Sequence, residues 1–82
     1  MSKRADEPYL LDMRAHALEA RQNLAGFTYD TWAANRNQQI VISHLLMIIG
    51  EAASKVTKET QEANPQIPWK RIIGMRNRII HG

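Results

Sequence analysis

Residues 41–56 read VISHLLMIIGEAASKV. At about 100° of rotation per residue, the apolar side chains of this stretch fill one broad arc of a helical wheel. The arc holds Val41, Ile42, Leu45, Leu46, Ile48, Ile49, Ala52, Ala53 and Val56. So wide an apolar arc indicates contact with at least two other helices. We therefore predict a central helix that Asn35 opens, that runs to about Ala63, and that Asn64-Pro65 closes.

A narrower row of mostly small residues lies beside this arc, at spacings of three and four. It consists of Ile40, Ser43, Met47, Gly50 and Ser54. Small side chains let another backbone approach closely, so the row suits either a dimer seam or tight packing within the chain. His44, Glu51 and Lys55 share the polar side, which we interpret as a solvated face.

The residues before the central stretch predict another long helix. Residues 1–7 are polar and expected to fray. Asp6 or Glu7 marks the helix start, with Pro8 at the first helical position, and the helix ends near Gly26. Its apolar face repeats at spacings of three and four, through Leu10, Met13, Ala17, Ala20 and Leu24.

The connector to the central helix is aromatic. Thr28 or Asp30 can cap a short helix that runs through Trp32 and Ala33. Clustered aromatic rings are able to stack on nucleobases. They also anchor connectors onto small cores, and we favour this second role for Phe27, Tyr29 and Trp32.

The last helical region follows a proline-bracketed turn. Pro65 and Pro68 bound the turn, helix resumes at Trp69, and Gly74 is expected to break this region in two. No strand alternation, internal repeat or interdomain linker is visible. The sequence thus predicts one domain over residues 1–82, an all-α antiparallel bundle of four to five helices whose last helix is cut short.

Composition narrows the class of protein. A chain of 82 residues buries a thin core, which favours oligomerisation. The absence of cysteine excludes a disulfide scaffold and fits a reducing cytoplasm. The N-terminus has no signal-peptide pattern, and the longest apolar run, residues 45–49, is too short to span a bilayer. We expect a cytoplasmic protein without a membrane partner.

The net charge of +3 is unevenly distributed. Residues 70–82 hold Lys70, Arg71, Arg76 and Arg78 with no acid, whereas residues 1–69 carry a net charge of −1. A local basic patch suits a polyanion such as nucleic acid. The alternative is that these cations only complement the dipole of a helix C-terminus.

Several common catalytic and metal-binding patterns are missing. The chain has no glycine-rich phosphate loop, no G-x-S-x-G and no H-E-x-x-H. Its three histidines, His16, His44 and His81, lack ligand spacing, so we predict neither a metal nor a cofactor. Asp12 and His16 are one helical turn apart, either as an acid–histidine relay or, as we favour, as a surface pair.

Arg76 breaks the apolar pattern of the last helix, because it falls between Ile79 and Ile80 on the wheel. A buried guanidinium without an anion costs several kcal/mol. Arg76 therefore either pairs with an acid of the chain such as Glu51, reaches round to solvent, or faces a cleft in which the anion is a phosphate. Arg76 and His81 point about 140° apart on one helix. They meet only if the arginine bends round, or if the helix pairs with its copy across a dimer.

Four runs carry a family resemblance, in order and over nearly the whole chain. They are YLLD at residues 9–12, IIGEAA at 48–53, IPW at 67–69 and IIGMRNRIIHG at 72–82. They resemble the HepT-like family of the HEPN superfamily of helical proteins. The family's R-x-x-x-x-H motif falls on Arg76 and His81, with Asn77 as the usual polar residue after the arginine.

The resemblance implies a toxin of a prokaryotic, type VII-like toxin–antitoxin pair that acts as a metal-independent endoribonuclease. It also implies a homodimer, or a higher homo-oligomer, with both motifs facing a shared cleft. The implied antitoxin is an MNT-type nucleotidyltransferase, which in some members adenylylates a tyrosine two residues after the motif histidine. This sequence ends at Gly82, one residue before that tyrosine, so we expect a chain truncated at its C-terminus.

The implied chemistry assigns a role to each residue. The RNA 2′-hydroxyl attacks the adjacent phosphate, His81 acts as general base or acid, and Arg76 stabilises the transition-state charge. Asn77 orients the phosphate or the imidazole, and Arg78, Lys70 and Arg71 bind the RNA backbone. Two alternatives remain: a non-catalytic HEPN module that binds a nucleotide or a nucleotidyltransferase, and a plain dimerisation bundle in which Arg76 pairs with an acid of its own chain.

Overall fold

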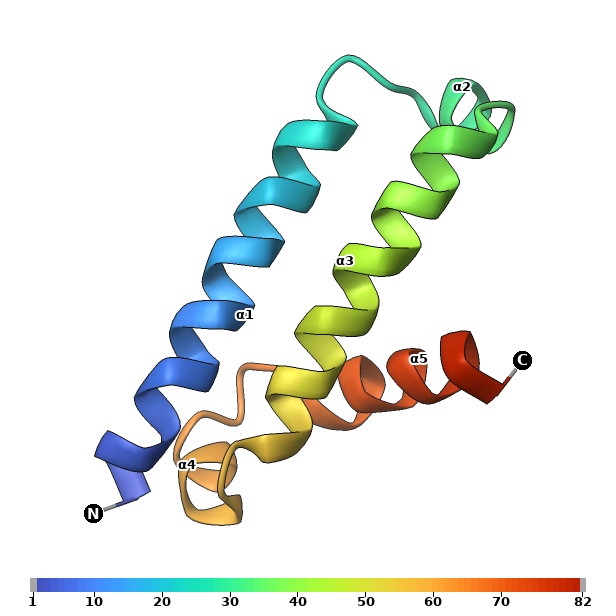
Figure 1. Ribbon diagram of the computed structural model, residues 1–82. Coiled ribbons are helices and arrows are strands. Elements are labelled where there is room, and N and C mark those ends of the chain that lie inside the picture. Colours follow the sequence, from blue (N-terminus) through green and yellow to red (C-terminus); the bar gives the residue numbers. More distant parts are fainter. Residues whose placement is uncertain (1, 82) are drawn as a thin grey trace.

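The computed structural model describes residues 2–81, with side chains from residue 4 onward. These residues form helices α1 (Ser2–Leu24), α2 (Tyr29–Ala33), α3 (Arg36–Lys55), α4 (Lys58–Ala63) and α5 (Trp69–His81), with no strand among them. The long helices α1 and α3 run side by side, α2 sits at the start of α3, and α5 crosses the second half of α3 (Figure 1). The predicted all-α bundle is confirmed.

The core lies along the apolar arc of α3. One group of buried residues joins α3 to α1 and α5: Met13, Ile49, Ala52, Ala53, Val56 and Trp69. A smaller group lies nearer α2: Ala20, Ile42 and Leu45. Within the predicted arc only Val41 is exposed, at 37%. The wide arc therefore serves two neighbouring helices, as its width predicted.

The central helix ends earlier than predicted. It stops at Lys55 rather than near Ala63, because Val56 is extended (φ −71°, ψ 135°) and Thr57 caps a separate helix, α4. Thr57 Oγ1 accepts a hydrogen bond from the backbone N–H of Thr60. The backbone N–H of Thr57 turns away from α3 and donates to Asp6 Oδ1 at 3.0 Å. A tertiary hydrogen bond thus replaces the next bond of the helix.

The same contact explains why the start of α1 was also predicted wrongly. Helix already spans Ser2 onward, so Pro8 lies inside α1 rather than at its first position. Asp6 is only 1% exposed, and its carboxylate accepts hydrogen bonds from the hydroxyls of Thr57 and Thr60 as well as from the Thr57 N–H. This carboxylate fixes the first turns of α1 to the cap of α4. Pro8 lies past the first turn of α1, so it removes the hydrogen bond that an N–H at this position would donate to the backbone oxygen of Arg4.

Gly74 does not break the last helical region, contrary to expectation. Helix α5 runs without interruption from Trp69 to His81, and nothing lies within 4 Å of the place that a Cβ of Gly74 would take. Trp69 is buried against α3, and its Nε1 donates to the backbone oxygen of Asn64 at 3.0 Å. Packing on α3 therefore outweighs the helix-weakening effect of one exposed glycine, which is about 1 kcal/mol.

No helix in the described part of the chain combines the length and the apolar character that crossing a bilayer requires.

Replacing Asp6 with asparagine should destabilise the fold at neutral pH. The Thr57 hydroxyl first, and the Thr60 hydroxyl next, hold the pKa of the Asp6 carboxyl below its ordinary value, while burial opposes them. Because the folded-state pKa is lowered, the stabilisation is fully present above the ordinary value of about 3.9 and is lost as pH falls through the folded-state pKa.

Thermal unfolding followed by circular dichroism at pH 7 and pH 3 checks this. The gap in unfolding midpoint between the wild type and Asp6→Asn should be wide at pH 7 and narrower at pH 3. Glu19→Gln, which neutralises an exposed carboxylate on α1, serves as the control. A gap that is the same at both pH values, or wider at pH 3, would contradict the assignment.

Candidate functional site

Helix α5 touches α3 most closely at Gly50. A Cβ placed on Gly50 would overlap Arg76 Cβ and would lie 3.0 Å from both Arg76 Cγ and the backbone oxygen of Ile72. Gly50 is buried in α3, and Arg76 is partly buried in α5. At this position the row of small residues therefore serves tight packing within the chain, one of the two roles predicted for it.

The guanidinium of Arg76 has no acidic partner. Its Nη1 donates to Asn77 Oδ1 at 3.0 Å, while its Nε is buried and has no hydrogen-bond partner among the described residues. Glu51, the acid suggested by the sequence, lies 3.8 Å from Lys55 Nζ instead. No carboxylate of residues 4–81 pairs with Arg76. The interpretation of Arg76 as one half of an internal ion pair is therefore wrong.

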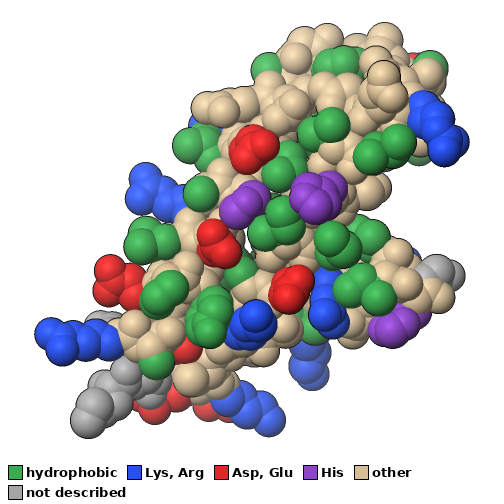
Figure 2. Space-filling model, in the orientation of Figure 1, with side chains coloured by type: hydrophobic (Ala, Val, Ile, Leu, Met, Phe, Trp, Pro, Cys, Tyr) green, Lys and Arg blue, Asp and Glu red, His purple; other side chains and the backbone are tan. Residues whose placement is uncertain are grey.

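His81 is the last residue of α5 and is exposed. Figure 2 shows hydrophobic and basic side chains at the surface in the region of α5. Asn77 and His81 are one turn apart on one flank of α5. The guanidinium of Arg76 bends towards this flank, because it reaches Asn77. The structure thus brings Arg76 and Asn77 together, and among the described residues no side-chain hydrogen bond joins either of them to His81.

The three basic residues predicted to bind RNA are all exposed, but they do not share one face. Lys70 lies on the flank of Asn77 and His81. Arg71 and Arg78 border a hollow of about 510 Å³ on the outer surface of α5, together with Gly74 and Met75. The basic surface therefore extends round α5 from the flank of His81 to the side away from α3.

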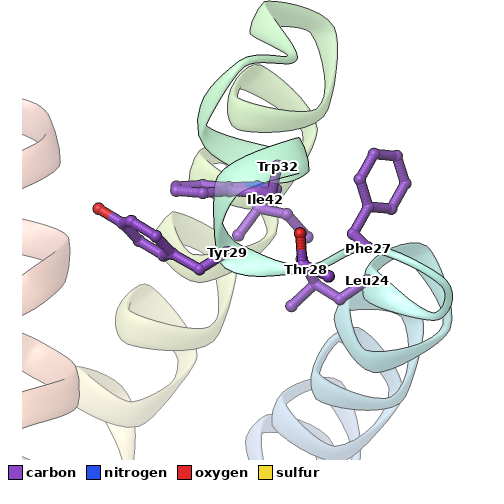
Figure 3. A pocket seen from close by; sticks show the side chains of 6 residues that line it. All are labelled: Leu24, Phe27, Thr28, Tyr29, Trp32 and Ile42. Atoms are coloured by element: carbon purple, nitrogen blue, oxygen red, sulfur yellow. The ribbon is translucent and has the colours of Figure 1, made fainter.

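A second hollow lies at the other end of α3 and is apolar. It has a volume of about 390 Å³ and is lined by Leu24, Phe27, Thr28, Tyr29, Trp32 and Ile42 (Figure 3). Trp32 packs against the smaller core group, whereas Tyr29 is 78% exposed, with its ring centroid 6.1 Å from that of Trp32. No charged side chain lines this hollow. Trp32 therefore anchors α2 to the core, the role that we favoured for the aromatic cluster.

The remaining polar candidates are ordinary surface groups. His16 Nδ1 lies 2.8 Å from the backbone oxygen of Asp12 and 3.8 Å from the Asp12 carboxylate, at an exposed position typical of a surface pair. Across the residues that the structure describes, no group of three or more histidine, cysteine or acidic side chains is arranged to hold a metal ion. Helix α5 and its crossing with α3 thus remain the main candidate site.

Sequence reasoning missed two residues: Gly50, which lies at this site, and Asp6, which joins α1 to α4. The role of Gly50 was signalled by the row of small residues, but the sequence did not show which helix packs there. The role of Asp6 had no such signal, since an acid beside a proline near a chain terminus is typical of an exposed helix start. Only the tertiary contact with Thr57 and Thr60 reveals it.

Comparison with known proteins identifies the family of the chain. The family model described as "Ribonuclease HepT-like" matches residues 13–82. The chain is 31% identical over 81 residues to "Putative RNase MJ1380" of Methanocaldococcus jannaschii, covering 99% of this chain and 74% of the relative. It is 29% identical over 80 residues to "Probable ribonuclease HepT" of Thermococcus cleftensis, covering 96% and 72%. No solved structure matches.

Proposed function

The chain belongs to the HepT-like ribonuclease family, and from this premise we propose that it is a metal-independent endoribonuclease, the toxin of a prokaryotic, type VII-like toxin–antitoxin pair. One observation carries the proposal. Arg76 is a partly buried residue whose Nε is shielded from solvent, and no carboxylate of residues 4–81 neutralises its charge. Burying a cation without an anion is costly, and a phosphate of RNA supplies the missing charge.

The reaction transfers a phosphoryl group within the RNA. The 2′-hydroxyl loses its proton and attacks the adjacent phosphorus, the bond to the 5′-oxygen breaks, and that oxygen receives a proton. The products are a 2′,3′-cyclic phosphate and a free 5′-hydroxyl. Histidine exchanges protons near neutral pH, so exposed His81 acts as the base, the acid or both.

Arg76 and Asn77 stabilise charge and orient the reacting groups. The Nη1 of Arg76 is held by Asn77 Oδ1, and its outer guanidinium N–H groups stabilise the charge that develops on the phosphate oxygens. The amide N–H₂ of Asn77 is left to orient the phosphate or the imidazole. Lys70, Arg71 and Arg78 bind neighbouring phosphates without reading sequence.

A homodimer with a shared cleft would complete the site. Five residues along a helix separate Arg76 and His81 by about 7.5 Å and about 140°, so one copy of α5 presents them in different directions. Helix α5 also exposes apolar side chains, among them Ile80 at 44%. A second copy would cover these side chains and bring its own motif to the same cleft. The proposed antitoxin is an MNT-type nucleotidyltransferase, and the proposed compartment is the cytoplasm.

Cleavage of RNA in EDTA tests the catalytic assignment. Arg76→Ala and His81→Ala should each lower kcat by about a hundredfold to ten-thousandfold, the usual contributions of charge stabilisation and of acid–base catalysis. Mass spectrometry of the products should find 2′,3′-cyclic phosphate ends. Arg14→Ala and His44→Ala remove an exposed residue of the same type elsewhere and should leave kcat unchanged.

Equal cleavage by the wild type and both motif variants would show that the motif is not catalytic. A wild type that cuts no RNA but still binds a nucleotide or a nucleotidyltransferase would instead support the non-catalytic module.

Mixing the two inactive variants tests the shared cleft. A dimer of one Arg76→Ala subunit and one His81→Ala subunit still holds one intact Arg76 and one intact His81. If the motifs converge, co-expressing the variants should restore cleavage well above that of either variant alone. Analytical ultracentrifugation should show the mass of a dimer in all three samples. A dimer without restored activity would rule out convergence and leave the catalytic roles of the two residues open.

Arg71 and Arg78, on the side of α5 away from α3, should contribute to RNA binding rather than to the chemical step. Arg71→Ala and Arg78→Ala should each reduce the slope of log Kd against log salt by about 0.7, the value for one lost phosphate contact on a single strand. The His81→Ala background prevents cleavage during this measurement, and Arg21→Ala controls for net charge. An unchanged slope would exclude these arginines from the RNA path.

A further inference from the structure

We propose that Gly50 is a positioning residue for Arg76: the missing side chain in α3 forms a notch that aims the guanidinium into the active site. The inference deepens the proposed ribonuclease function and depends on it. It concerns a residue of α3, outside the R-x-x-x-x-H motif, that has no functional group of its own.

Position 50 requires glycine because no room is left for a side chain, and not because its backbone conformation is unusual. Gly50 lies within α3, and the only positive φ in the described chain belongs to Gly26. Glycine weakens a helix relative to alanine. A larger residue at this point of the central helix would place its Cβ against atoms of α5. These atoms are Arg76 Cβ, Arg76 Cγ and the backbone oxygen of Ile72.

These three atoms are poorly able to move aside. The far end of a long side chain can swing away from an added methyl group. The first two side-chain atoms of Arg76 move only if its χ1 rotamer changes or if α5 itself shifts, and the Ile72 oxygen moves only with the helix backbone. A methyl group at position 50 therefore redirects Arg76 in either case.

Two contacts then define the direction of the arginine. Its stem lies in the Gly50 notch, and its Nη1 is held by Asn77 Oδ1 at 3.0 Å. Between them, the Nε is buried without a partner in the described chain, so the stem is held by packing rather than by a hydrogen bond. Because a displacement of about 1 Å from the reacting geometry costs about a hundredfold in rate, the notch controls catalysis through Arg76.

The matched test compares Gly50→Ala with Gly74→Ala. Both variants add one methyl group to a helical glycine, but nothing lies within 4 Å of a Cβ at Gly74. Gly50→Ala should lower kcat by about ten- to a hundredfold and leave KM within about twofold, because the RNA-binding cations remain in place. Gly74→Ala should keep kcat, because its methyl group meets no atom within 4 Å, and its place beside Arg71 and Arg78 affects KM alone. A Gly50→Ala enzyme with the kcat of Gly74→Ala overturns the inference.

A second pair of variants tests whether Gly50→Ala lowers kcat by redirecting Arg76 or by disturbing α5 as a whole. Arg76→Gly removes both Cβ and Cγ, and guanidinium ion added to the buffer substitutes for the lost group. In this background Gly50→Ala should change the guanidinium-rescued kcat by less than about twofold, since both Arg76 atoms that it meets are gone and only the Ile72 oxygen remains, at 3.0 Å. A loss as large as in the wild-type background would show that Gly50 acts on the helix and not through Arg76. This comparison also serves if Gly50→Ala alone fails to fold.

Different results would contradict the ribonuclease function and the role of Gly50. If Arg76→Ala and His81→Ala leave cleavage intact, the proposed function is wrong. If those variants abolish cleavage but Gly50→Ala does not lower kcat, the function stands and only the role of Gly50 is wrong.

Discussion

The close approach of α5 to α3 at Gly50 is the contact on which the candidate site depends. Helix α5 is joined to the rest of the bundle mainly through α3. At the crossing, the stem of an arginine occupies the space of a missing side chain, so in our proposal packing and function share the same atoms. A charged residue on an apolar face is normally a defect in a helix, but here its aliphatic part fills a cavity and its charged end reaches the surface.

Hydrophobic periodicity predicted the helices well and their ends poorly. The apolar arc of α3 identified the core and the number of neighbours, because burial of one face is a local property of the sequence. The break at Val56 and the early start of α1 both follow from one buried carboxylate, Asp6. Its partners lie 51 and 54 residues away, beyond the reach of any local pattern.

At the candidate site too, local sequence patterns predicted some features, while others depend on contacts between distant parts of the chain. The motif residues could be named from the sequence, since Arg76 violated the apolar pattern and the surrounding runs resembled a known family. The sequence left an acid of the chain, solvent or a phosphate as the partner of Arg76, and among the described residues the structure argues against the acid, because Glu51 pairs with Lys55. The aim of Arg76 could not be predicted, as it depends on the helix that faces it. The relation between Arg76 and His81 involves a second copy of α5 in our proposal, which one sequence does not describe.

The buried carboxylate also sets an order of events during synthesis. Asp6 is made early, but its partners are Thr57 and Thr60. The first turn of α1 therefore has no tertiary anchor until more than two thirds of the 82 residues have left the ribosome. Closing so long a loop is slow compared with forming a helix. Helix α5 follows Thr60 in the chain, so its basic surface is completed only after the bundle that holds it can close.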